Sequence, residues 1–276
     1  MSRDSARVLG RLVGAALLFG WIGASHARID PKTIAGMWLF DEGKGDVVAD
    51  LSGNGNDGTL TGNVDWVDGP FGGAVEFPGD VQSFVSVPHA ESLTMEDEVT
   101  VMFWVRTEKE MVDMWNDRQI VVGKHYTEYE VGIYMDGQLH TYTSDGGGNY
   151  DEGILVSFAG KLPDGDRDWE LGKWYHVAWT LQGQNEVAYV NGVRVGEHVK
   201  AHVGTRPGTH PLEIGRRVGG SLPLTGAVDE VIVLNVALEE EDVKSAMELG
   251  LGRATGITAV DPVGKVATTW GALKGR

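Results

Sequence analysis

The segment Val99-Thr100-Val101-Met102-Phe103-Trp104-Val105 decides the fold of this sequence. Alternate side chains of a β-strand point to opposite faces, so the three valines and Phe103 share one face while Met102 and Trp104 lie on the other. Both faces are apolar, which is typical of a strand in the middle of a sheet that is covered on both sides. We therefore predict a central strand at 99–105.

Further short apolar or alternating runs lie on either side of this strand, separated by clusters of Gly, Asn and Asp. The dipeptides Asp136-Gly137 and Asn191-Gly192 lie between such runs and favour the positive φ angles of tight hairpin turns. The pattern predicts two hairpins at these positions. We predict strands at 34–40, 73–77, 84–87, 99–105, 119–124, 130–135, 138–142, 154–158, 174–181, 186–190, 212–215 and 227–234.

Helical periodicity is confined to one segment, residues 239–249. Its first turn is acidic, Val243, Ala246 and Met247 form an apolar stripe, and Gly250 can end the helix. Many strands with a single short C-terminal helix predict an all-β protein. Its fold class is an antiparallel β-sandwich.

Composition and charge narrow the range of possible partners and sites. The 276 residues include 40 Gly and no Cys, 42% are hydrophobic, and the formal net charge is -17 at pH 7. This hydrophobic content predicts a folded chain that can bury a core. The negative charge disfavours nucleic acid and anionic membrane surfaces as partners, and it is compatible with divalent cations. Without Cys there is no disulfide framework and no thiolate metal site.

The N-terminus has the pattern of a secretory signal peptide. Arg3, Arg7 and Arg11 precede an apolar run at 12–22, and the small residues Ser25 and Ala27 suit positions -3 and -1 of a cleavage site. We predict a signal peptide at 1–27, no stable membrane insertion after its cleavage, and a secreted or periplasmic protein. An uncleaved membrane anchor is the alternative.

Four groups of motifs occur in a fixed order along the chain. They are Trp38-Leu39-Phe40-Asp41-Glu42-Gly43 followed by Asp50-Leu51-Ser52-Gly53-Asn54-Gly55-Asn56-Asp57-Gly58; Ala74-Val75-Glu76-Phe77 with Phe84-Val85-Ser86-Val87; Gly172-Lys173-Trp174-Tyr175-His176-Val177-Ala178 with Tyr189-Val190-Asn191-Gly192; and Gly226-Ala227-Val228-Asp229-Glu230-Val231. In this order they resemble the laminin-G-like, concanavalin A-like jellyroll domains of secreted bacterial proteins. The resemblance covers about residues 34–249. It implies a jellyroll domain at 28–250 and a binding scaffold for glycans, proteins or lipids. The C-terminal tail at 251–276 contains one predicted strand, at 264–269, and either packs as an extra edge or remains loose.

The loop after residue 49 is a candidate calcium site. Asp50, Ser52, Asn54 and Asn56 place oxygen-bearing side chains at every second position, a spacing similar to the first half of an EF-hand loop. The bidentate Glu of an EF-hand is missing, because Thr61 occupies its position. The alternative is a turn whose side chains cap their own backbone amides.

The resemblance supplies a partner for this loop. In similar domains such loops can be completed by the acid pair near the last strand, which points to Asp229, with Asp41 or Glu42 as a further contributor. We therefore predict that Asp50, Asn54, Asn56 and Asp229 share a structural Ca²⁺.

Two polar loops with aromatic residues are candidates for ligand binding. One carries Trp115, Asn116, Asp117 and Arg118, the other carries Tyr150, and His125 lies at a nearby turn. An aromatic ring beside carboxylate, amide and guanidinium groups suits the apolar faces and hydroxyl edges of sugars. The alternative is that these aromatic residues pack their loops onto the sheet.

Motifs for catalysis are missing from the sequence. Laminarinase-type glucanases share the jellyroll and use Glu-x-Asp-x-x-Glu, which does not occur here, and neither does a Gly-x-Ser-x-Gly elbow. We expect an exported, non-catalytic module that binds carbohydrate. The alternatives are an adhesion or structural domain that binds an extracellular protein, and a glycan-active hydrolase or lyase.

Overall fold

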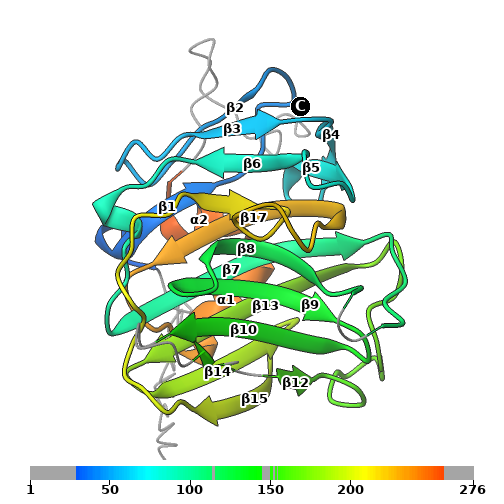
Figure 1. The fold of residues 1–276 in the computed structure, drawn as a ribbon, viewed down its shortest axis with the longest axis vertical. Helices are drawn as coiled ribbons and strands as arrows, with labels where there is room; N and C mark the ends of the chain where they lie inside the picture. Colours follow the sequence, from blue (N-terminus) through cyan, green and yellow to red (C-terminus); the bar gives the residue numbers. More distant parts are fainter. Residues whose placement is uncertain (1–28, 114–115, 145–149, 152, 154, 258–276) are drawn as a thin grey trace, which may run out of the picture.

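The computed structural model describes residues 29–113, 116–144, 150–151, 153 and 155–257. The predicted signal peptide, Trp115 and the strand predicted at 264–269 lie outside these residues. Within them, two antiparallel sheets pack face to face (Figure 1). This confirms the predicted all-β sandwich.

The first sheet, sheet A, is the one at the back in Figure 1. Its order is β15-β14-β13-β7-β17-β5-β4, and β1 pairs with β17. Its strands are β1 (Ile34–Trp38), β4 (Asp65–Gly69), β5 (Gly72–Pro78), β7 (Glu98–Thr107), β13 (Trp174–Gln182), β14 (Asn185–Val190), β15 (Val193–Val199) and β17 (Thr225–Leu234). Strand β7 lies between β13 and β17, which confirms the central position predicted for 99–105.

The second sheet, sheet B, has the order β11-β10-β9-β8-β16-β6-β3-β2, and β12 pairs with β10. Its strands are β2 (Val47–Val48), β3 (Gly58–Thr61), β6 (Phe84–Val87), β8 (Gln119–His125), β9 (Tyr129–Tyr134), β10 (Gln138–Ser144), β11 (Tyr150–Asp151), β12 (Leu155–Ser157) and β16 (Leu212–Ile214). Single 3-10 turns, η1 (Pro31–Thr33) and η2 (Glu91–Leu93), precede β1 and β7.

The main core fills the space between the sheets. Phe103 of β7, Val131 of β9 and Trp179 of β13 belong to it and are fully buried. The turns that join these strands follow the predicted chemistry. Asp136-Gly137 and Asn191-Gly192 all have positive φ, between 49° and 71°, as two-residue hairpins require.

Two short helices follow the last strand, where one was predicted. They are α1 (Glu240–Leu249) and α2 (Leu251–Thr255), separated by Gly250 at φ 75°. Both lie behind sheet A in Figure 1. Leu251 and Ala254, which we had assigned to the tail, are buried in the apolar layer on the outer face of this sheet. Neither helix has the length and apolar character needed to cross a membrane, as far as the described part of the chain goes.

Five strands were not predicted: β2, β3, β4, β11 and β15. They are short or lie at the edges of the sheets, and the residues of β2, β3, β4 and β15 are mostly half-buried or exposed. An edge strand buries too little surface to impose a clear apolar alternation, so its sequence does not distinguish it from a loop.

Candidate functional site

The outer face of sheet B, which the helices do not cover, carries a group of aromatic and charged side chains. On β9, Tyr129, Val131 and Ile133 point into the core, so Glu130 and Tyr134 point outward. The same alternation places His140 and Tyr142 of β10 on this face. We call the group the aromatic strip; it consists of Arg118, Tyr126, Glu130, Tyr134, His140, Tyr142 and Arg217.

A glycine makes room in the floor of the strip. Gly132 pairs with His140 of β10 and with Ile120 of β8. A Cβ atom at Gly132 would lie 2.6 Å from Ile120 Cδ1, too close for any other residue without displacement. The His140 ring lies beside this gap, edge-on to Tyr134 at 4.7 Å and to Tyr142 at 3.9 Å between ring centroids.

Arg118 joins two strands at one end of the strip. Its Nη1 atom donates hydrogen bonds to the hydroxyl oxygens of Tyr134, at 2.8 Å, and of Tyr142, at 2.9 Å. The guanidinium carbon lies 5.8 Å from the centroid of the Tyr134 ring. The two hydrogen bonds fix both phenols relative to Arg118, and the cation–π contact adds to the attraction for Tyr134.

Arg217 forms the centre of the strip. It donates from Nε to both carboxylate oxygens of Glu130, at 3.0 and 3.1 Å, and from Nη2 to Oε1. Its guanidinium carbon lies 4.9 Å from the Tyr142 ring and 5.4 Å from the Tyr126 ring. Glu130 is fully buried, and this burial raises its pKa although Arg217 acts in the opposite direction.

His140 is held neutral. Burial, together with the positive charges of Arg118 and Arg217, lowers its pKa to about 3. Its Nδ1 atom is buried and has no hydrogen-bond partner among the described residues. Tyr134, His140 and Tyr142 are all buried and form a closed floor. A ligand would first meet the half-buried Arg118, Tyr126 and Arg217 above it.

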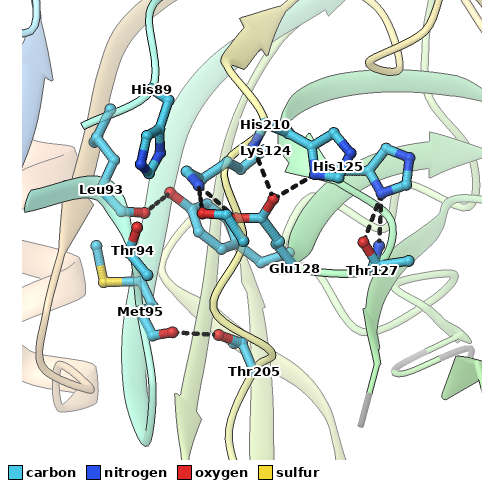
Figure 2. Close-up of polar contacts among 12 residues, drawn as sticks. His89, Leu93, Thr94, Met95, Lys124, His125, Thr127, Glu128, Thr205 and His210 are labelled. Atoms are coloured by element: carbon cyan, nitrogen blue, oxygen red, sulfur yellow. Dashed lines mark hydrogen bonds and ion pairs between the residues drawn. The ribbon is translucent and has the colours of Figure 1, made fainter. Parts of the chain in front are cut away.

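A pair of stacked histidines adjoins the strip. The rings of His125 and His210 are nearly parallel, at 9°, with centroids 4.0 Å apart, and His125 also lies 4.1 Å from the Tyr126 ring. Figure 2 shows His125 Nδ1 beside Thr127 and His210 Nδ1 beside Glu128, at 2.6 Å in both cases. We call His125 and His210 the histidine stack.

The predicted ligand residues are distributed as follows. Arg118 lies in the strip and His125 beside it, so the structure brings these two to one face. Asn116 and Asp117 stabilise their own loop: Asn116 donates to Asp113, and Asp117 accepts the N–H groups of Val112 and Asp113. A hydrogen bond from Lys109 is the largest effect that lowers the pKa of Asp117.

The other two predicted ligand residues cannot be placed in the site. Tyr150 lies in β11, where its backbone pairs with Ser144 of β10 beside the strip, and its side chain is not among the described parts. Trp115 lies outside the described residues.

Sequence reasoning missed Glu130, Tyr134, Tyr142, Arg217 and His210. The alternation within β9 and β10 contains the signal for the two tyrosines and Glu130, since it places them on the face opposite the core. Arg217 and His210 come from segments more than 80 residues away in sequence from Glu130 and Glu128, and no local pattern identifies them.

The predicted calcium loop is closed by its own hydrogen bonds. Asp50 Oδ1 accepts the N–H groups of Met37 and Ser52, and Oδ2 accepts the N–H of Asn56 and the hydroxyl of Ser52, at 2.7 to 3.0 Å. The side-chain amides of Asn54 and Asn56 donate to the Ala35 carbonyl oxygen. This geometry fits the self-capped turn, the alternative reading of the loop.

Asp229 belongs to a different group of contacts. Its Oδ2 accepts the N–H of Phe71 at 3.1 Å, and its buried Oδ1 has no hydrogen-bond partner in the described part of the chain. Burial and the charge of Asp41 raise its pKa to about 7. An open carboxylate oxygen suits a cation, but no contact links Asp229 to Asp50, Asn54 or Asn56 in the described structure. Nor do three or more acidic or histidine side chains of the described residues converge on one point. The calcium site stays a prediction.

Comparison with known proteins identifies the family. A family model described as the concanavalin A-like lectin/glucanases superfamily matches residues 79–244, more than half of the chain. The chain belongs to this superfamily. Membership confirms the resemblance seen in the four motif groups and agrees with the two-sheet sandwich. The comparison with curated proteins gave no match.

Solved structures with this superfamily fold include binding domains of bacterial proteins. The binding domain of Paraclostridial Mosquitocidal Protein 1 is 19% identical, with a TM-score of 0.64 over 79% of this chain and 52% of that one. Domain 4 of AbnA, an extracellular arabinanase from Geobacillus stearothermophilus, in complex with arabinotriose, is 19% identical, with a TM-score of 0.57 over 77% and 97%. The receptor binding domain of a botulinum neurotoxin C/D mosaic is 15% identical, with a TM-score of 0.61 over 80% and 52%. The chain thus spans about half the length of the toxin domains, and these likenesses show the fold alone.

Proposed function

We propose that the protein is an exported, non-catalytic module that binds carbohydrate on the outer face of sheet B. The observation that carries this proposal is the aromatic strip, in which Arg118 and Arg217 lie over tyrosine rings on the face that the helices leave uncovered. Guanidinium groups donate several hydrogen bonds to hydroxyl oxygens, and the half-buried Tyr126 ring offers apolar surface to the C–H face of a sugar.

The related structures support a binding role. Domain 4 of AbnA was solved with arabinotriose, and one botulinum neurotoxin binding domain was solved with rat synaptotagmin II. The fold therefore serves both sugar and protein ligands in other proteins, and the side chains of the face must decide between them. Two half-buried arginines beside the half-buried Tyr126 ring favour sugar.

A glycan array probed with the purified protein tests the proposal. We expect selective binding to one class of glycan, and an Arg118→Ala variant should weaken it at least tenfold because the strip loses one of its two cations and two hydrogen bonds. The matched control is Arg194→Ala, since Arg194 pairs with Glu197 on the exposed edge strand β15 of the opposite sheet. Circular dichroism should show that both variants fold.

Three results would contradict this proposal. Absence of binding to every glycan would favour a protein partner. Equal losses in the two arginine variants would move the site away from the strip. Cleavage of a bound glycan would show that the protein is an enzyme.

A further inference from the structure

The histidine stack continues the aromatic strip without a break. Tyr126 contacts both, because its ring lies 4.1 Å from the His125 ring and 5.4 Å from the guanidinium carbon of Arg217. Arg217 in turn lies 4.9 Å from Tyr142, which accepts a hydrogen bond from Arg118. A single row of polar and aromatic groups therefore extends from Arg118 to His210.

This row follows the direction of the strands. Tyr134 lies near the Arg118 end of β9, and Tyr129, at the other end of β9, pairs with His125. Five residues of extended strand span about 17 Å at roughly 3.4 Å per residue. That distance is longer than one sugar ring and matches a short run of linked sugars.

The stack is held in place by a buried ion pair. Lys124 is fully buried and donates to Glu128 Oε2 and, at 2.9 Å, to the carbonyl oxygen of Gly208. Glu128 Oε1 accepts the Nδ1 of His210 at 2.6 Å and its backbone N–H at 3.3 Å. Figure 2 shows the Glu128 carboxylate between Lys124 and His210. Separating a buried ion pair leaves an uncompensated charge, so these contacts hold the His210 segment against the β8–β9 turn.

His125 adopts a backbone conformation that seldom suits a residue with a side chain. Its φ is 133°, and this conformation places its ring between those of Tyr126 and His210. Such strain persists only where the surroundings enforce it, and it is common at ligand sites. The side chain of His210 remains 44% exposed, so the stack presents an imidazole to solvent at the end of the row.

We infer that the histidine stack is a second contact region of the glycan site, so that the ligand is an extended, linear oligosaccharide rather than a single terminal sugar. This inference rests on the proposed function. The Arg118 end binds one part of the chain, and the His125–His210 end binds sugars several units further along it.

Calorimetric titration with arabino-, xylo- and gluco-oligosaccharides of one to six units tests the inference. We expect the affinity for the preferred series to rise at least tenfold between two and five units and then to level off. His210→Ala should abolish this rise and leave disaccharide affinity within twofold of the wild type. His210→Phe, which keeps a stacking ring, should retain part of the rise. His198→Ala, on β15 of the opposite sheet, is the matched control and should behave as the wild type.

The outcomes separate the two proposals. Affinity that is independent of chain length, or a rise that survives His210→Ala, overturns the extended ligand and leaves carbohydrate binding intact. Absence of binding at every length, in all three series, contradicts the proposed function, and the inference is then overturned with it.

Discussion

The two outer faces of the sandwich are covered in different ways. On sheet A, the protein's own helices cover an apolar layer that includes Met102, Ile232 and Leu251. On sheet B, paired charges and phenols lie over the strands: Arg118, just before β8, contacts Tyr142, and Arg217 comes from 87 residues away to pair with Glu130. A face closed by its own chain needs no other partner. This difference supports our proposal that the ligand binds on sheet B.

The largest expected effect tests the charged covering of sheet B. Arg217→Met should destabilise the protein by about 3–5 kcal/mol, because it leaves the buried Glu130 carboxylate without its cation. Urea unfolding measures this change. A double variant that adds Glu130→Gln should recover much of the loss, and Arg194→Met, in an exposed pair, should cost less than about 1 kcal/mol. Equal costs for the two arginines would show that the strip is no more buried than an ordinary surface.

The next effect concerns the apolar covering of sheet A. Ile232→Ala should cost about 2–4 kcal/mol, since it removes buried methyl groups beneath the helices and leaves a cavity. Because Ile232 lies on the face opposite the strip, glycan affinity should not change. The same unfolding and titration experiments measure both quantities. A variant that folds normally and has lost its affinity would contradict the assignment of function to sheet B.

Acid should lower the stability of the folded protein, because each outer face of the sandwich contains a buried histidine. Burial lowers the pKa of His176, on sheet A, to about 3, and burial with Arg118 and Arg217 does the same for His140. An unfolded histidine titrates near 6.5, so the folded chain binds fewer protons between about pH 3 and 6.5. The stability present above pH 6.5 is therefore lost as the pH falls towards 3, by about 2 kcal/mol per histidine at pH 5.

The two histidines should respond differently to salt. Salt screens the half-buried arginines, so 1 M NaCl should raise the pKa of His140, whereas the pKa of His176, which depends on burial alone, should stay constant. Histidine titration by NMR, assigned with His140→Phe and His176→Phe, measures both. Identical salt dependence would show that the arginines do not act on His140.

The smallest effect tests the loop at Asp50. Asp50→Ala should cost about 1–2 kcal/mol, because the buried N–H of Met37 loses its acceptor. For a self-capped turn, the cost is the same in Ca²⁺ and in chelator, as read from the melting temperature. A larger cost in Ca²⁺ would show that Asp50 binds the ion. Asp229→Asn, under the same two conditions, tests the open carboxylate separately.

Residues that act locally were well predicted. The Asp136-Gly137 and Asn191-Gly192 turns, the central strand at 99–105 and the helix near Val243 each depend on a few neighbouring residues, and the structure contains all four. The sequence allowed two interpretations of the Asp50 loop, a calcium site and a self-capped turn, because alternating oxygen-bearing side chains suit both. The contacts of this loop with the Met37 and Ala35 backbone depend on the tertiary structure, and they fit the capped turn.

The sequence by itself determined the sandwich, because the alternation of apolar residues and the conformational freedom of glycine act over a few residues. It also placed Arg118 and His125 among the candidates for binding. The tertiary structure alone decided that they share one face, and that Glu130 meets Arg217 and Glu128 meets His210 across more than 80 residues. Strand order and register set these distances. No local pattern encodes them, because they depend on how the whole sheet is paired.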